Sequence, residues 1–177
     1  GRGVTVDYVQ SLYWYERAAS HGHVNAQNNL GALYYRGQGV QQDYEQALYW
    51  NRKAAAGGLA SAQFNLGFMY ATGRGVAQSD ELAARWYQSA AEAGNAQAQR
   101  MLGRLYAIGC GITQDAQRSA MWYRKAAQSG LAQSQTDTIL TYCSAAEATR
   151  DSGSTSAGSK PLTAAVRQVT ARRFLDD

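Results

Sequence analysis

A 36-residue repeat dominates this sequence. Glycines start its four copies, at Gly1, Gly37, Gly73 and Gly109. Two aromatic positions recur in the same register: Trp14, Trp50, Trp86 and Trp122, and Tyr34, Tyr70, Tyr106 and Tyr142. Self-similarity at a period of roughly 20–50 residues is the sequence signature of a stacked array of supersecondary units. The chain is therefore expected to fold as such an array.

Each copy carries the pattern of two helices. In the second copy, Asp43 precedes an apolar stripe at helical spacing, and Gln46 follows three residues later. This pattern predicts a capping box at the start of a helix. Gly57 and Gly58 are predicted to end that helix, because glycine adopts the left-handed C-terminal conformation without strain. Gly67 lies in the next helix and is predicted to let the two helices of the copy approach closely.

We name the first helix of each copy the B helix and the second the A helix. The register predicts eight of them, at about 7–20, 24–36, 43–56, 60–72, 79–92, 96–108, 115–128 and 132–143. A linker of small, polar residues is expected at 144–160. A capping helix is expected to follow at 161–175, within the terminal segment 161–177. Neither helix of a pair can bury its stripe alone, so neighbouring pairs must cover it. The predicted fold is all-α, a right-handed α/α superhelix of about four helix hairpins in residues 1–143 with a C-terminal cap.

The repeated string GxGVxxDxxxAxxWxxKAAxxGxxxAQxxLGxxY resembles the Sel-one-like repeat (SLR) family, a relative of the tetratricopeptide repeat. The resemblance covers residues 1 to about 143 and implies an α-solenoid that acts as a scaffold or adaptor for other proteins. It supplies no shared catalytic residues. The departures are Ser79 for the capping Asp, Ser89 for the basic residue, and Thr138-Ile139 for the Leu-Gly pair.

Charge and hydropathy narrow the class of partner. The net charge is +4, from 17 basic and 13 acidic residues that are spread over the repeats. Nucleic-acid binders carry a dense basic stripe, so no nucleic-acid partner is expected. The sequence contains no run of about 18 apolar residues, so no membrane span is expected. We expect a monomer with a protein or peptide partner. The chain opens in the middle of a repeat, as a fragment of a longer protein would, so its compartment stays open.

Residues that could carry chemistry are few. His21 and His23 are the only histidines, and zinc needs about four ligands. The GxGV loops do not continue as the GK[ST] of a phosphate-binding loop, and the four tryptophans are predicted to pack in the core. No metal, cofactor or catalytic residue is expected. Two alternatives stay open: a structural spacer in a larger protein, and a cysteine-poor relative of repeat proteins linked to penicillin binding and weak β-lactamase activity.

Cys110 and Cys143 are the only cysteines, and 33 residues separate them. Equivalent helix ends in a stacked array lie about 10 Å apart, and a disulfide needs Cα atoms roughly 4.4–6.8 Å apart. A disulfide between them is thus geometrically feasible, with two unrelated thiols as the alternative. If present, it favours a periplasmic or secreted location over a cytoplasmic one.

The partner is expected on A-helix positions that packing does not require and that line the concave groove of such a solenoid. Phe64 and Phe68 stand out, because the same positions hold Asn28 and Ala32 in the first copy. An aromatic anchor beside Arg and Asn donors suits a peptide with apolar side chains and an acidic group or free C-terminus. Local packing of both rings is the alternative. The candidate groove residues are Asn25, Asn28, Tyr35, Arg36, Phe64, Phe68, Gln97, Arg100 and Arg104.

Overall fold

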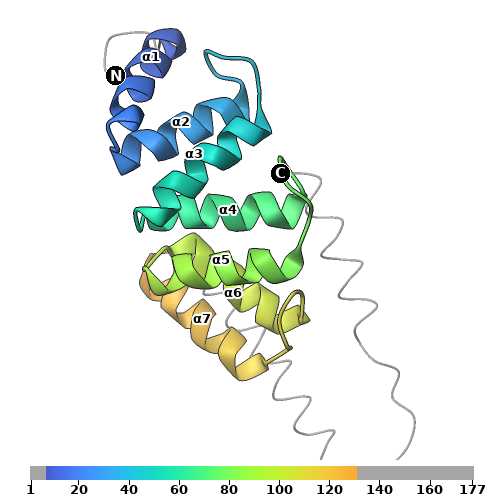
Figure 1. Ribbon diagram of the computed structural model, residues 1–177. Coiled ribbons are helices and arrows are strands. Elements are labelled where there is room, and N and C mark those ends of the chain that lie inside the picture. Colours follow the sequence, from blue (N-terminus) through green and yellow to red (C-terminus); the bar gives the residue numbers. More distant parts are fainter. Residues whose placement is uncertain (1–6, 131–177) are drawn as a thin grey trace, which may run out of the picture.

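The computed structural model describes residues 7–130. They form seven α-helices of 13 residues each: α1 (Tyr8–Ser20), α2 (Val24–Arg36), α3 (Tyr44–Ala56), α4 (Ala60–Thr72), α5 (Asp80–Glu92), α6 (Ala96–Ile108) and α7 (Ala116–Gln128). No strand occurs between residues 7 and 130. The helices stack from α1 to α7, with short turns along one edge and longer loops along the other (Figure 1). The predicted all-α solenoid is confirmed.

The A helices α2, α4 and α6 have the predicted bounds, and each B helix begins one residue later than predicted. The first residue of each predicted B range is the N-cap. Asp43 accepts from the backbone N–H groups of Glu45 and Gln46, at 3.0 Å or less. Asp7 caps α1 in the same way, whereas Ser79 and Asp115 each accept from a single backbone N–H, that of Leu82 and that of Arg118. The helices predicted at 132–143 and 161–175 and the linker at 144–160 lie outside the described residues.

In a capping box, a side chain three residues after the N-cap also accepts from the backbone N–H of the N-cap residue. Here that N–H instead forms a hydrogen bond to the preceding helix. The backbone N–H of Asp43 donates to the carbonyl of Tyr34 in α2, at 3.0 Å. Ser79 and Tyr70 repeat this bond at 3.0 Å, and Asp115 and Tyr106 repeat it at 2.9 Å. Each of these three caps therefore joins a B helix to the A helix that precedes it.

The repeated Leu-Gly pair packs an A helix on the following B helix. Leu30, Leu66 and Leu102 are fully buried. A Cβ atom added at Gly67 would lie 2.7 Å from the Tyr87 ring of α5. The prediction that Gly67 brings together the two helices of its own copy, α3 and α4, is therefore wrong. The close approach joins α4 to α5, because the A helix is pressed against the next B helix.

Glycine backbone conformations shape both kinds of connection. Gly58 adopts the left-handed conformation, with φ of 82°, whereas Gly57 has φ of −75°. Gly57 is instead required for space, since a Cβ there would lie 2.7 Å from Val24. In the loop after α4, Gly73 and Gly75 both have positive φ, at 68° and 71°.

The buried core runs through the stack as a series of clusters. One cluster combines Leu48 of α3 with Leu66 and Met69 of α4, and Trp86 of α5 packs against it. Trp50 likewise packs on the cluster around Leu30, and Trp122 is 7% exposed in a cluster with Leu102 and other residues of α5 and α6. Each of these three tryptophans thus contacts a preceding pair of helices, as expected for core residues.

Trp14 differs from the other three tryptophans. It lies on α1, which no other described helix precedes, and it is 56% exposed. The core prediction is wrong for this residue. The same sequence position is therefore buried or exposed according to its place in the stack.

Candidate functional site

The candidate groove residues lie on the three A helices, as predicted. Asn25, Arg36 and Gln97 are exposed. The others are half-buried: Asn28, Tyr35, Phe64, Phe68, Arg100 and Arg104. We call the surface formed by these nine residues the A-helix face. Its half-buried side chains lie between neighbouring helices and also reach solvent.

A polar junction joins the first two A helices of this face. Asn65 Nδ2 of α4 donates to Asn28 Oδ1 of α2, at 3.1 Å. The same nitrogen donates to Asn51 Oδ1 of α3, at 3.1 Å, and Asn51 Nδ2 donates to the Ala47 carbonyl, at 2.8 Å. Asn51 is only 2% exposed. The junction therefore satisfies both polar atoms of a buried amide.

An aromatic junction lies one repeat further along the stack. Phe64 of α4 packs against Tyr87 of α5, with ring centroids 5.6 Å apart. Tyr87 is 1% exposed, and among the described residues its hydroxyl has no hydrogen-bond partner. Burial raises the pKa of Tyr87 well above its ordinary value, and the positive charge of Arg104 acts in the opposite direction. Local packing against Tyr87 thus explains part of why a phenylalanine occurs at position 64, as the alternative interpretation predicted.

Phe68 belongs to a cluster that sequence reasoning missed. Its ring lies 6.2 Å from that of Tyr35, and the Tyr35 ring lies 5.2 Å from that of Tyr44. The guanidinium of Arg74, in the loop after α4, lies over all three rings, at 5.5 Å from Tyr35, 5.7 Å from Tyr44 and 5.9 Å from Phe68. Its Nη1 also donates to the Tyr35 hydroxyl. A signal was present, because the next copy has Ala71, Asp80 and Arg104 at the three ring positions.

The repeated tyrosine near the end of each A helix has a different polar partner in each repeat. Tyr34 Oη donates to Glu16 Oε1, at 3.3 Å, and Arg52 Nη2 donates to Tyr70 Oη, at 2.9 Å. Burial, followed by the charge of Glu16, raises the pKa of Tyr34. These two pairs attach α2 to α1 and α4 to α3, in each case an A helix to the B helix before it.

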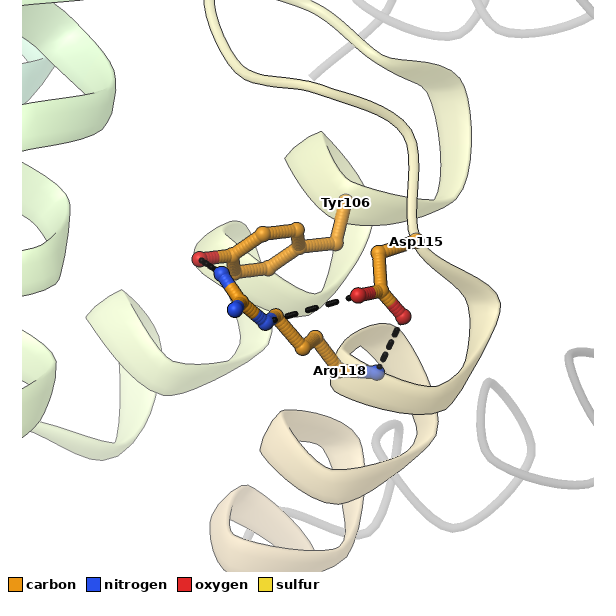
Figure 2. A network of polar contacts seen from close by, with 3 residues as sticks. All are labelled: Tyr106, Asp115 and Arg118. Atoms are coloured by element: carbon orange, nitrogen blue, oxygen red, sulfur yellow. Dashed lines mark hydrogen bonds and ion pairs between the residues drawn. The ribbon is translucent and has the colours of Figure 1, made fainter.

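Tyr106 is instead attached to the B helix after it. Figure 2 shows Arg118 of α7 reaching from Asp115 to the Tyr106 hydroxyl. Arg118 Nη1 lies 3.4 Å from Tyr106 Oη, and Arg118 Nε lies 3.4 Å from Asp115 Oδ2. The Arg118 side chain is 64% exposed, so this ion pair is a surface contact of small energetic value.

Groups suited to metal or nucleophilic chemistry are sparse in residues 7–130. His21 Nδ1 is bonded to the Arg17 carbonyl, at 2.7 Å. His21 and His23 border a shallow pocket of about 270 Å³ beside Trp14, but within the described range no three His, Cys, Asp or Glu side chains are grouped as metal ligands would be.

Cys110 is half-buried in the loop after α6, and Cys143 lies outside the described residues, so their disulfide remains a prediction. No helix in that range is long and apolar enough to cross a membrane.

The Sel1 repeat family model matches four stretches of the chain, residues 1–23, 24–59, 60–95 and 96–131. The complete units begin at an A helix and end after the next B helix. This register agrees with the packing of Gly67 in α4 against Tyr87 in α5. A search of curated proteins gave no match.

Solved structures with the same fold come from several bacteria. A protective antigen of uropathogenic Escherichia coli with an SLR fold is 40% identical, with a TM-score of 0.74 over 77% of this chain. This chain spans only 29% of that antigen's length. A Sel1 repeat protein from Oxalobacter formigenes is 41% identical, with a TM-score of 0.68 over 73% of this chain and 98% of the other. The Helicobacter pylori cysteine rich protein B shares the fold at 18% identity, with a TM-score of 0.60 over 77% of this chain and 98% of that protein.

Proposed function

Because this chain belongs to the Sel1 repeat family, we propose that it binds a segment of a partner protein along the A-helix face. Sel1 repeat proteins generally act as protein–protein interaction scaffolds and are generally non-catalytic. The segment would lie in the predicted groove, across α2, α4 and α6, with the chain itself acting as a monomer.

One observation carries this proposal. The A helices repeat the residues that pack the stack and differ where their side chains reach solvent. The Leu-Gly pair recurs at Leu30, Leu66 and Leu102, all fully buried. The position two residues before each leucine holds Asn28, Phe64 or Arg100, and all three are half-buried. Varied side chains at the solvent-reaching positions of a fixed scaffold are typical of a recognition surface.

The side chains on this face favour a partner segment with two properties. The half-buried side chains of Phe64 and Phe68 offer apolar contact, and aromatic residues are prominent among the anchors of protein interfaces. Arg100 and Arg104 provide positive charge on the neighbouring A helix. We expect the bound segment to present apolar side chains to α4 and an acidic group or a C-terminus to α6.

The test begins with a pull-down by the purified chain from its native organism, followed by mass spectrometry. The affinity of each captured partner is then compared for the parent and for Phe64→Ala combined with Arg100→Ala. We expect the double substitution to weaken binding at least about tenfold, or about 1.4 kcal/mol. Thermal unfolding is recorded for both proteins, because Phe64 also packs against Tyr87.

A matched control removes one apolar and one arginine side chain from the B helices. Met121 is 42% exposed on α7, and Arg85 is exposed on α5. Met121→Ala combined with Arg85→Ala should leave the affinity unchanged. Full affinity of the Phe64→Ala, Arg100→Ala protein with an intact fold would place the partner on another surface.

A further inference from the structure

The most distinctive group outside the repeated packing is Arg74 with its three rings. Tyr35 comes from α2, Tyr44 from α3 and Phe68 from α4, so three helices converge on one guanidinium. Arg74 is nevertheless exposed to solvent. A guanidinium stacked on aromatic faces is held in a fixed orientation while its outer N–H groups stay available. The rings thus orient a positive charge at the surface.

The loop does not need this cluster in order to fold. The equivalent loops have Gln38 and Cys110 at the position of Arg74, and their flanking glycines adopt the same left-handed conformations. Gly37 and Gly39 have φ of 66° and 74°, and Gly109 and Gly111 have φ of 70° and 66°. Holding the loop in place is therefore an insufficient explanation for three aromatic rings and an arginine that occur together at only one of these three loops.

We propose that Arg74 recognises a side-chain carboxylate on an acidic segment of the partner protein. The inference rests on the proposed function and specifies the partner's chemistry, because Tyr35 and Phe68 belong both to this cluster and to the A-helix face. Among the described residues no carboxylate forms an ion pair with Arg74. The planar guanidinium matches a carboxylate with two parallel hydrogen bonds. The net charge of +4 also favours an acidic partner over a basic one.

Whether the ring cluster is empty or already filled decides the charge of the ligand that it can bind. An empty cluster of three rings would suit a cation from the partner. Here the chain's own guanidinium already lies over the rings, within 5.9 Å of each centroid. The group left for a partner to contact is a positive charge, and its complement is an anion.

The experiment uses the full chain and three pools of short random peptides. One pool has two fixed Glu residues and an amidated C-terminus, the second has Gln at those positions, and the third has Gln with a free C-terminus. We expect the parent to prefer the Glu pool over the amidated Gln pool about tenfold. Arg74→Gln should abolish that preference, and Arg74→Lys should restore part of it because it keeps the charge without the planar fork.

Arg85→Gln is the matched control, since it removes one positive charge from an exposed position on α5. It should keep the preference for Glu. The inference is overturned if Arg74→Gln keeps that preference, if the parent binds both amidated pools equally, or if the Arg74-dependent preference appears only for the free C-terminus. Phe64→Ala combined with Arg100→Ala should weaken binding of all pools, so equal binding of both amidated pools would leave the proposed function standing. Failure of the parent to bind any pool would overturn both.

Discussion

The second and third repeats solve the same packing problem with different chemistry. Beneath Gly31 of α2 lies Asn51, and beneath Gly67 of α4 lies Tyr87, at the equivalent position one repeat later. Asn51 is buried and forms hydrogen bonds with Ala47 and Asn65. Tyr87 is buried against Phe64, and no described residue pairs with its hydroxyl. The glycine position thus fixes how closely the helices approach, while the residue facing it is free to be polar or aromatic.

The two junctions should differ in how much they stabilise the stack. The aromatic junction depends on buried area and shape, whereas the polar junction depends on completing a hydrogen-bond network. The first is sensitive to loss of volume, and the second is sensitive to loss of a single partner.

The largest expected effect is that of Tyr87→Ala. Truncating a large, fully buried aromatic side chain costs about 3–5 kcal/mol of unfolding free energy, because a cavity remains beside Gly67 and Phe64. Asn51→Ala should cost less, about 1–3 kcal/mol. Urea unfolding monitored by circular dichroism gives both values. As a control, Tyr49→Ala removes a tyrosine that is 47% exposed and should change the free energy little. A larger loss for Asn51→Ala than for Tyr87→Ala would reverse the comparison.

An intermediate effect is expected for Asn65→Ala. The substitution leaves the buried Asn51 Oδ1 without its donor, which should lower the unfolding free energy by about 1–3 kcal/mol. Asn29→Ala is the control, since Asn29 occupies the equivalent position in α2 and is exposed. It should change stability by less than about 0.5 kcal/mol. Equal effects of the two substitutions would show that the polar junction contributes no stability.

The smallest effect is expected for Tyr87→Phe. At neutral pH the change should stay within about 0.5 kcal/mol, because the hydroxyl that is removed has no hydrogen-bond partner among the described residues. Burial raises the folded-state pKa of Tyr87 above the unfolded value of about 10. The unfolded chain therefore ionises first, and Tyr87 costs the parent stability as the pH rises above about 10. The variant escapes this loss.

Unfolding in urea at about pH 7 and about pH 11 tests both statements. The variant should gain stability relative to the parent at the higher pH. A neutral-pH loss above about 1 kcal/mol would indicate that the Tyr87 hydroxyl is hydrogen-bonded after all.

The sequence predicted the helices closely because the repeat marks them several times over. The A helices have their predicted bounds, and the B helices differ only by their caps. Periodicity also identified Gly67 as a close contact. It could not say which neighbouring helix makes that contact, because a period identifies equivalent positions and not spatial partners.

The candidate site was less accessible to sequence reasoning. The A-helix positions follow from the register, and their partner-binding role remains a prediction. The Arg74 cluster depends on Tyr35, Tyr44 and Phe68 meeting from three helices. Tyr35 and Phe68 are visible as departures from the equivalent positions of the other copies, whereas Tyr44 matches Tyr8 of the first copy. The convergence of the three rings requires the stacked geometry.

The contact between each long loop and the helix beneath it has a consequence for how such arrays change length. A Cβ at Gly39, Gly75 or Gly111 would come within 2.5 Å of backbone atoms of Tyr8, Tyr44 or Asp80, the first residues of α1, α3 and α5. Main chain thus rests on main chain at every step, independently of the side chains there. The spacing between repeats should therefore be kept when a repeat is exchanged. A unit taken from another member of the family would pack in register provided that it carries this glycine.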